Sequence, residues 1–103
     1  MYWMETIVCS VKPEGRARLQ RNLNTRQEYK RRQTGCIAAW SAVAADNPDM
    51  ILIQTIFSSA AKWKAISELT QRQFDNTDGG IEQFLIGPPL VGVFEVDESQ
   101  LGL

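Results

Sequence analysis

The sequence contains no histidine, and this excludes several kinds of catalytic and metal site. Without histidine there is no Ser–His or Cys–His nucleophile pair and no imidazole ligand for zinc or iron. The two cysteines, Cys9 and Cys36, lack the Cys-x-x-Cys spacing of a zinc motif. We interpret them as small buried hydrophobic residues, with a disulfide between them as the open alternative. We therefore expect no metal site.

The chain also has no long apolar run and no recognisable leader. It contains no stretch of about 18 apolar residues, so no transmembrane helix is predicted. The segment Met1–Val11 lacks the basic region and the small-residue cleavage site of a signal peptide. We expect a cytoplasmic protein without membrane partners. Its 103 residues predict a single domain, 1–103, in which 97–103 form a loose acidic C-terminal tail.

The stretch Thr34–Trp63 organises the rest of the chain. The turn formers Asp46–Asp49 separate two apolar runs, Cys36–Ala45 and Met50–Phe57, and this pattern predicts a β-hairpin. Neither run alternates cleanly between apolar and polar residues, so both faces of the hairpin are apolar. Strands of this kind belong to a sheet that is covered on both faces.

The remaining elements complete a common topology. The pattern predicts a strand at Trp3–Val11, a helix at Arg16–Gln33, a helix at Ala60–Thr70, a short helix at Gly80–Leu85 and a strand at Leu90–Val96. The order β-α-β-β-α-β predicts an α+β ferredoxin-like sandwich, with a four-stranded antiparallel sheet in the order 4-1-3-2. Right-handed crossovers place both helices on one face. Because the other face is also apolar, we expect the same face of a second copy to cover it in a homodimer.

Basic residues concentrate in the segment Arg16–Gln33, which holds seven of the eleven lysines and arginines. We interpret them mainly as a solvated face whose long stems lie over apolar surface. The alternative is that Arg26 or Lys30 points into a cavity and meets an anionic group. Nucleic acid is not an expected partner, because Met50–Phe57 lacks the basic and aromatic signature of RNA-recognition domains.

Several local motifs resemble those of the antibiotic biosynthesis monooxygenase family, in the dimeric α/β-barrel superfamily. They are Val11–Gly15 after the first strand, Thr34–Ile37 at the start of the second, Asn47–Pro48 in the hairpin and Phe57–Ala61 at the junction with the following helix. The resemblance covers roughly residues 4 to 96. It implies a dimeric α/β barrel in which each subunit has a cavity between its helices and its sheet.

Members of that family differ in activity. Some oxidise polycyclic aromatic phenols with O₂ and without metal or flavin, others degrade haem, and others have no known activity. Haem degradation is disfavoured here, because Ile66 stands where that branch has its histidine ligand and Trp3–Val11 contains no Asn. Phe57 also replaces a frequent Trp of the family.

The resemblance thus implies a monooxygenase-like oxidoreductase that needs no cofactor and acts on a small aromatic or quinol-type substrate. The alternative is a non-catalytic dimeric module of the same fold that binds a small ligand or another protein. Oxygenation of a phenol needs an apolar pocket for a planar substrate and a group that helps to deprotonate it. No base is marked by its spacing, and Glu28, Tyr29 and Arg26 are the candidates.

We predict that a ligand site lies between the helices and the end of the strand Met50–Phe57. The candidate substrate-binding residues are Phe57, Trp63, Trp40, Thr55, Phe74 and Arg26. Aromatic residues at these spacings are also typical of an ordinary core, which is the alternative for each of them.

Overall fold

The computed structural model describes all 103 residues and contains one four-stranded antiparallel sheet. The strands are β1 (Tyr2–Ser10), β2 (Cys36–Ala44), β3 (Asn47–Phe57) and β4 (Leu90–Val96), and they lie in the order β2-β3-β1-β4. Helices α1 (Arg16–Arg31) and α2 (Ala60–Asp78) connect β1 to β2 and β3 to β4. The predicted α+β ferredoxin-like fold and its strand order are therefore confirmed.

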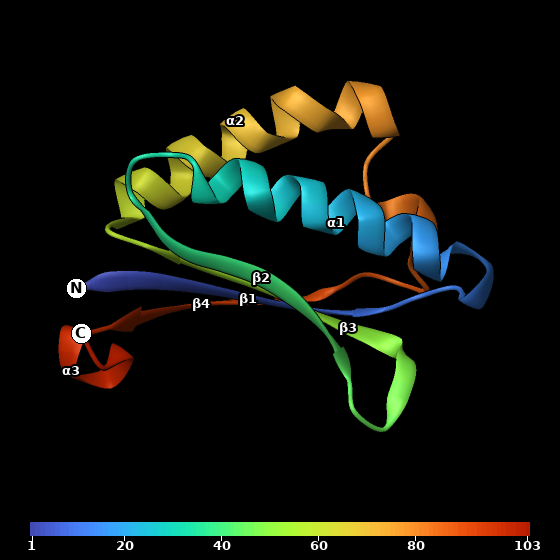
Figure 1. Cartoon of the computed structure of the whole chain (residues 1–103), viewed down its shortest axis with the longest axis horizontal. Helices are drawn as coiled ribbons and strands as arrows, with labels where there is room; N and C mark the ends of the chain where they lie inside the picture. The colour runs from blue at the N-terminus through green and yellow to red at the C-terminus, as the bar shows by residue number, and fades with distance from the viewer.

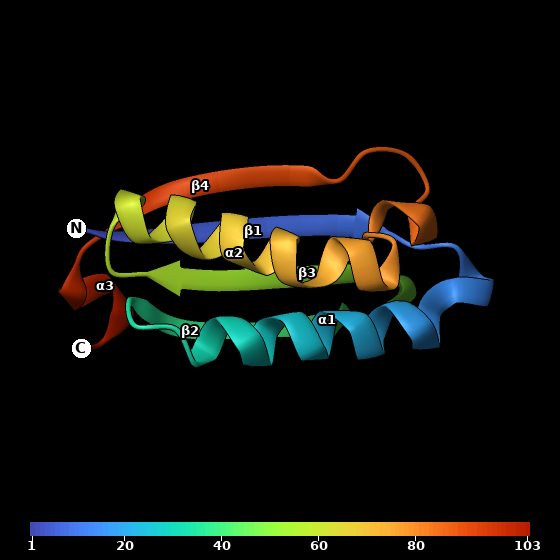
Figure 2. The ribbon, with the colours of Figure 1, turned by 90° about the horizontal axis from the view of Figure 1, so that it is seen from above.

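Both long helices cover the same face of the sheet (Figure 1). Seen from above, α1 runs along β2, and α2 runs over the central strands β1 and β3 (Figure 2). This arrangement agrees with right-handed connections on both sides of the hairpin. None of the helices is long and apolar enough to cross a membrane.

The core lies between α1 and the helix-facing residues of the two central strands. Cys9 pairs with Ile51 across β1 and β3, and both side chains are buried against Leu19 and Leu23 of α1. Cys9 and Cys36 are free thiols, so the disulfide alternative is excluded. Phe84, which follows α2, also packs against this cluster. These contacts fix one end of α1 on the sheet by ordinary apolar burial.

The opposite face of the sheet is apolar, and neither long helix lies over it (Figure 1). Its residues, which alternate with the core residues along each strand, are Tyr2, Met4, Thr6, Val8, Ala38, Trp40, Ala42, Met50, Leu52, Gln54, Ile56, Leu90, Gly92, Phe94 and Val96. We call this set the open face. It contains no charged residue, and Thr6 Oγ1 donates a hydrogen bond of 2.8 Å to Gln54 Oε1 within it. Phe94 is 51% exposed on it.

Two predictions after β3 were wrong. Helix α2 does not end near Thr70 but continues to Asp78, where Gly79 takes a left-handed conformation with φ of 79° and caps it. The short helix predicted at Gly80–Leu85 is only a single 3₁₀ turn at Glu82–Phe84. The turn-forming residues before Gly79 are tolerated in the last turns of a helix that is held by its neighbours.

The C-terminal residues 97–103 also differ from the expected loose tail. They contain a one-turn helix, α3 (Glu98–Leu101), which begins with a capping box between Asp97 and Gln100. In a capping box the side chain of each residue accepts a hydrogen bond from the backbone of the other. This local pairing orders a segment whose composition alone indicates a tail.

Phe57 is fully buried at the end of β3, so we expect Phe57→Ala to lower the free energy of unfolding by about 3–5 kcal/mol. Urea denaturation followed by circular dichroism measures this loss. The matched control is Leu69→Ala on the outer side of α2, where the side chain is 38% exposed and the expected loss is below about 1 kcal/mol. Equal losses at the two positions would contradict a core role for Phe57.

Candidate functional site

The buried stripe of α1 changes from apolar to polar in the middle of the helix. Leu19 and Leu23 are followed on the same side by Arg26, Gln27 and Lys30, and all five residues are buried. Long polar side chains are rarely buried unless they are paired. Beneath this polar half, a cavity of about 310 Å³ lies between the helices and the sheet.

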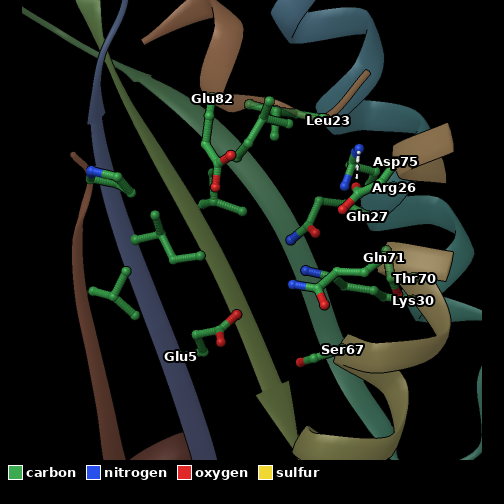
Figure 3. Close-up of a pocket in the computed structure, with 16 residues that line it drawn as sticks. Glu5, Leu23, Arg26, Gln27, Lys30, Ser67, Thr70, Gln71, Asp75 and Glu82 are labelled. Atoms are coloured by element: carbon green, nitrogen blue, oxygen red, sulfur yellow. Dashed lines mark hydrogen bonds and ion pairs between the residues drawn. The ribbon is translucent and has the colours of Figure 1, made fainter. Parts of the chain in front are cut away.

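Figure 3 shows polar side chains converging on this cavity from opposite walls. The sheet contributes Glu5, Ile7, Ile53 and Val91; the helices contribute Leu23, Arg26, Gln27, Lys30, Ser67, Thr70, Gln71 and Asp75; and the segment after α2 contributes Gly80, Ile81, Glu82 and Pro89. Lys30 and Gln27 point from α1 toward Glu5, which points back from β1 (Figure 3). The site is therefore a mixed cavity with aliphatic and charged walls.

Lys30 provides an ammonium group that no protein carboxylate neutralises directly. It is only 8% exposed, and none of the four ion pairs of the structure involves it. Burial lowers the pKa of Lys30 below its ordinary value, and the negative charge of Glu5 partly opposes that shift. Such a group can bind an anionic atom of a ligand or exchange a proton with it.

The same burial of Lys30 has a consequence for stability. Because the pKa is lower in the folded chain, the unfolded chain binds more protons in the range between the two pKa values. The cost of burying the ammonium is fully present below the folded-state pKa, and it is relieved as the pH rises from that pKa to the unfolded-state pKa. This is the sign expected for a residue kept for function rather than for stability.

Glu5 is held in place on the opposite wall. Its Oε2 accepts a hydrogen bond of 2.8 Å from the indole Nε1 of Trp63. Trp63 in turn packs against Trp3, with a ring-centroid distance of 6.1 Å. The Glu5 carboxylate is therefore oriented by an aromatic pair and keeps Oε1 for the cavity.

Gln27 is fixed by the sheet. Its Nε2 lies 3.1 Å from the backbone oxygen of Trp40, 2.9 Å from that of Gln54 and 3.1 Å from Thr55 Oγ1. Backbone oxygens only accept hydrogen bonds, so the orientation of the amide is determined. Gln27 Oε1 is then buried without a partner, and so is Ser67 Oγ on the helical wall. Unpaired buried polar atoms of this kind are rare in proteins.

Arg26, by contrast, is neutralised by the protein. Its Nη2 lies 2.9 Å from Asp75 Oδ1 and 2.7 Å from Asp78 Oδ1, and its guanidinium stands over the ring of Phe74 at 5.8 Å. Partial burial raises the pKa of Asp78, but hydrogen bonds from Arg26 and from Gly80 N–H outweigh this, and the pKa lies below its ordinary value. Arg26 therefore connects α1 to the end of α2 rather than offering a free cation.

Of the six residues predicted to bind substrate, only Arg26 lines the cavity. Phe57 is buried in the core, and Thr55 is buried beneath the amide of Gln27. Trp63 orients Glu5 from outside the lining, and Phe74 packs edge-on against Tyr29. Trp40 belongs to the open face and is 40% exposed. The cavity thus lies farther from the end of β3 than predicted, because Phe57 fills that end.

Sequence reasoning missed most of the polar lining. The sequence suggests Arg26 or Lys30 as a cation that points into a cavity. It gives no indication that Gln27, Glu5 and Ser67 line the same cavity. The usable signal is the row Leu23, Gln27 and Lys30, in which an apolar stripe continues at helical spacing with long polar residues. Neither Glu28 nor Tyr29, the other suggested bases, lines the cavity.

No group of three or more Cys, Asp or Glu side chains is placed to hold a metal ion. No model of a known protein family matches the chain, and no curated protein matches it either. Solved structures, however, are similar to it over most of its length.

Three of these structures illustrate the similarity. A protein from Nitrosomonas europaea, designated an antibiotic biosynthesis monooxygenase, superimposes with a TM-score of 0.80 at 14% identity and covers 90% of this chain and 88% of its own. One with the same designation from Deinococcus radiodurans has a TM-score of 0.77 at 14% identity, covering 95% and 94%. A point mutant of SnoaB, a cofactor-independent oxygenase from Streptomyces nogalater, has a TM-score of 0.77 at 11% identity, covering 94% of each chain.

The chain therefore has the fold of the antibiotic biosynthesis monooxygenases. This confirms, at the level of the fold, the resemblance inferred from the motifs around the hairpin. Identities of 11–14% establish the architecture and not the chemistry of the cavity. The activity must be argued from the side chains of this protein.

Proposed function

We propose that this protein binds a small phenolic or enolic molecule in the cavity and promotes its oxygenation by O₂ without metal or flavin. The observation that carries the proposal is the buried, unpaired ammonium of Lys30 facing the carboxylate of Glu5. A carboxylate that takes a proton and a cation that stabilises the resulting oxyanion form the pair that this chemistry needs.

The residues divide the proposed reaction between them. Glu5 removes the hydroxyl proton of the ligand, and Lys30 stabilises the phenolate or enolate oxygen. The anion is electron-rich and reduces O₂, so no external reductant is required. When a ring C–H becomes a carbonyl, one oxygen atom enters the product. The other oxygen atom leaves as water with the ring hydrogen and the hydroxyl hydrogen. The aliphatic wall residues Ile7, Ile53 and Val91 provide apolar surface for the carbon skeleton of the ligand.

The fold supports this proposal, because the similar structures include one described as a cofactor-independent oxygenase. A specific observation favours the alternative, a module that binds a ligand without transforming it. The cavity lining contains no aromatic side chain on which a planar substrate could stack. Oxygen consumption separates the two functions.

We expect the protein to accelerate oxygen uptake with members of a panel of naphthols and anthrones, measured with an oxygen electrode. Glu5→Gln and Lys30→Met should each lower the rate by about 100-fold or more, because each removes one half of the proton-transfer pair. Lys30→Met keeps a long side chain in the cavity and should fold normally. Lys64→Met on the exposed side of α2 is the control and should leave the rate unchanged.

Ligand binding without oxygen uptake would replace the oxygenase by the non-catalytic module. Uptake that both Glu5→Gln and Lys30→Met leave intact would show that the reaction does not use this cavity.

We also propose that the open face binds the same face of a second copy. Both long helices lie on the other side, and Trp40, Phe94 and Leu90 remain 40%, 51% and 75% exposed. The open face carries no charge, so it needs no partner of complementary charge, and two copies can bury it mutually. A dimer of this kind leaves both cavities on its outer sides.

Light scattering at micromolar concentration should give twice the 11.6 kDa mass of the chain. Phe94→Lys should produce a monomer, because it places an ammonium in an apolar interface. Ile86→Lys is the control, since Ile86 is 58% exposed but lies outside the open face, and it should remain dimeric. A monomeric wild-type protein at this concentration would disprove the proposal.

A further inference from the structure

We infer that the cavity selects ligands in which a hydroxyl group stands beside an ionised oxygen, such as a mono-ionised catechol or enediol. In this arrangement Gln27 Oε1 accepts the hydrogen bond of the ligand hydroxyl, while Lys30 binds the neighbouring oxyanion. The inference names the substrate class of the proposed site and rests on that site, but it concerns binding and not turnover.

The first requirement is an acceptor that cannot become a donor. An amide can usually present either its oxygen or its nitrogen to a ligand. In Gln27 the nitrogen is held by the backbone oxygens of Trp40 and Gln54 and by Thr55 Oγ1, so a flip would place oxygen against oxygen. Gln27 therefore offers only Oε1, which has no partner in the protein although the residue is only 2% exposed. A ligand that meets it must donate a hydrogen bond.

The second requirement is a cation close to that acceptor. Gln27 and Lys30 stand three residues apart on α1, and residues with this spacing are neighbours on one helix face. Figure 3 shows the two polar groups on the same wall of the cavity. Arg26 and Arg31 do not compete, because Arg26 is paired with Asp75 and Asp78, while Arg31 is exposed. The wall thus presents one acceptor and one unpaired cation side by side.

These two groups discriminate between similar phenols. A ligand without the second hydroxyl leaves Gln27 Oε1 buried and unpaired, and a methyl ether places a methyl group against it. Loss of a buried hydrogen bond of this kind corresponds to about 10- to 100-fold in affinity. A ligand without the ionised oxygen leaves Lys30 unpaired. Simple phenols should therefore bind weakly and ionised catechols tightly.

Three nitrophenols test this difference, because they ionise near neutral pH, absorb visible light when ionised and resist oxidation. They are 4-nitrocatechol, 2-methoxy-4-nitrophenol and 4-nitrophenol. Their dissociation constants are measured by absorbance titration of the wild-type protein in the absence of O₂. We expect 4-nitrocatechol to bind at least about 10-fold more tightly than either of the others.

Variants assign the preference to its residues. Gln27→Met should reduce the preference for 4-nitrocatechol to less than about 3-fold, because the acceptor is gone. Lys30→Met should weaken all three probes together and remove the absorbance shift of the bound anion. Gln73→Met is the matched control, since this amide is exposed on α2 and does not line the cavity, and it should keep the preference. If Gln27→Met does not fold, the comparison of the three probes on the wild-type protein still decides.

Equal binding of 4-nitrocatechol and 2-methoxy-4-nitrophenol would overturn the inference. Failure of all three to bind would also overturn it and would indicate a cavity filled by water. The oxygenase proposal is tested separately. If the protein prefers 4-nitrocatechol but consumes no O₂ with any naphthol, the binding inference stands and the proposed oxygenase activity is disproved. If the protein consumes O₂ with naphthols but does not prefer 4-nitrocatechol, the oxygenase proposal stands and the binding inference is disproved.

Discussion

The amide of Gln27 holds the polar half of α1 above the sheet. It bridges the backbone oxygens of Trp40 and Gln54 on two neighbouring strands, at a depth where the preceding residues of the same stripe are leucines. Next to Gln27 in the same buried stripe, Arg26 binds the carboxylates at the end of α2. These polar contacts fix the positions of both helices without filling the space between them and the sheet. The cavity therefore exists because α1 is held by hydrogen bonds and ion pairs where an apolar helix would pack closely.

The polar stripe also explains why the cavity is costly to maintain. Lys30 is buried without a carboxylate partner, and Gln27 Oε1 and Ser67 Oγ are buried without hydrogen bonds. Each of these features opposes folding, and apolar residues of similar size would be more stable at the same positions. Such features persist where a ligand supplies the missing partners. The two faces of the sheet thus have different tasks, since one forms a polar cavity with the helices and the other presents an uncharged apolar surface.

Most of the fold could be predicted from the sequence, because it depends on local signals. The turn formers at Asp46–Asp49 and the apolar runs on both sides predict the hairpin. The helical patterns before and after it predict the order of elements and hence the topology. The cavity could not be predicted in the same way. Gln27 and Lys30 are residue types that are common on a solvated helix face. They are buried only because of the orientation of α1 about its own axis on the sheet. Conversely, Phe57 and Trp63 are residue types that would suit an aromatic pocket. In the structure, however, Phe57 fills the core and Trp63 orients Glu5. Side chains on different helices and strands are brought together by tertiary packing, which short-range patterns do not encode.

The claim that depends most directly on this geometry is that Lys30 is a buried, unpaired cation. Protein labelled with ¹³C at the lysine Cε allows each of its four lysines to be titrated by NMR, and the Lys30→Met variant assigns the Lys30 signal. The structure predicts that the pKa of Lys30 lies below the ordinary value of a lysine, because burial disfavours its charged form. A Lys30 signal that titrates at or above the ordinary value of a lysine would contradict the account.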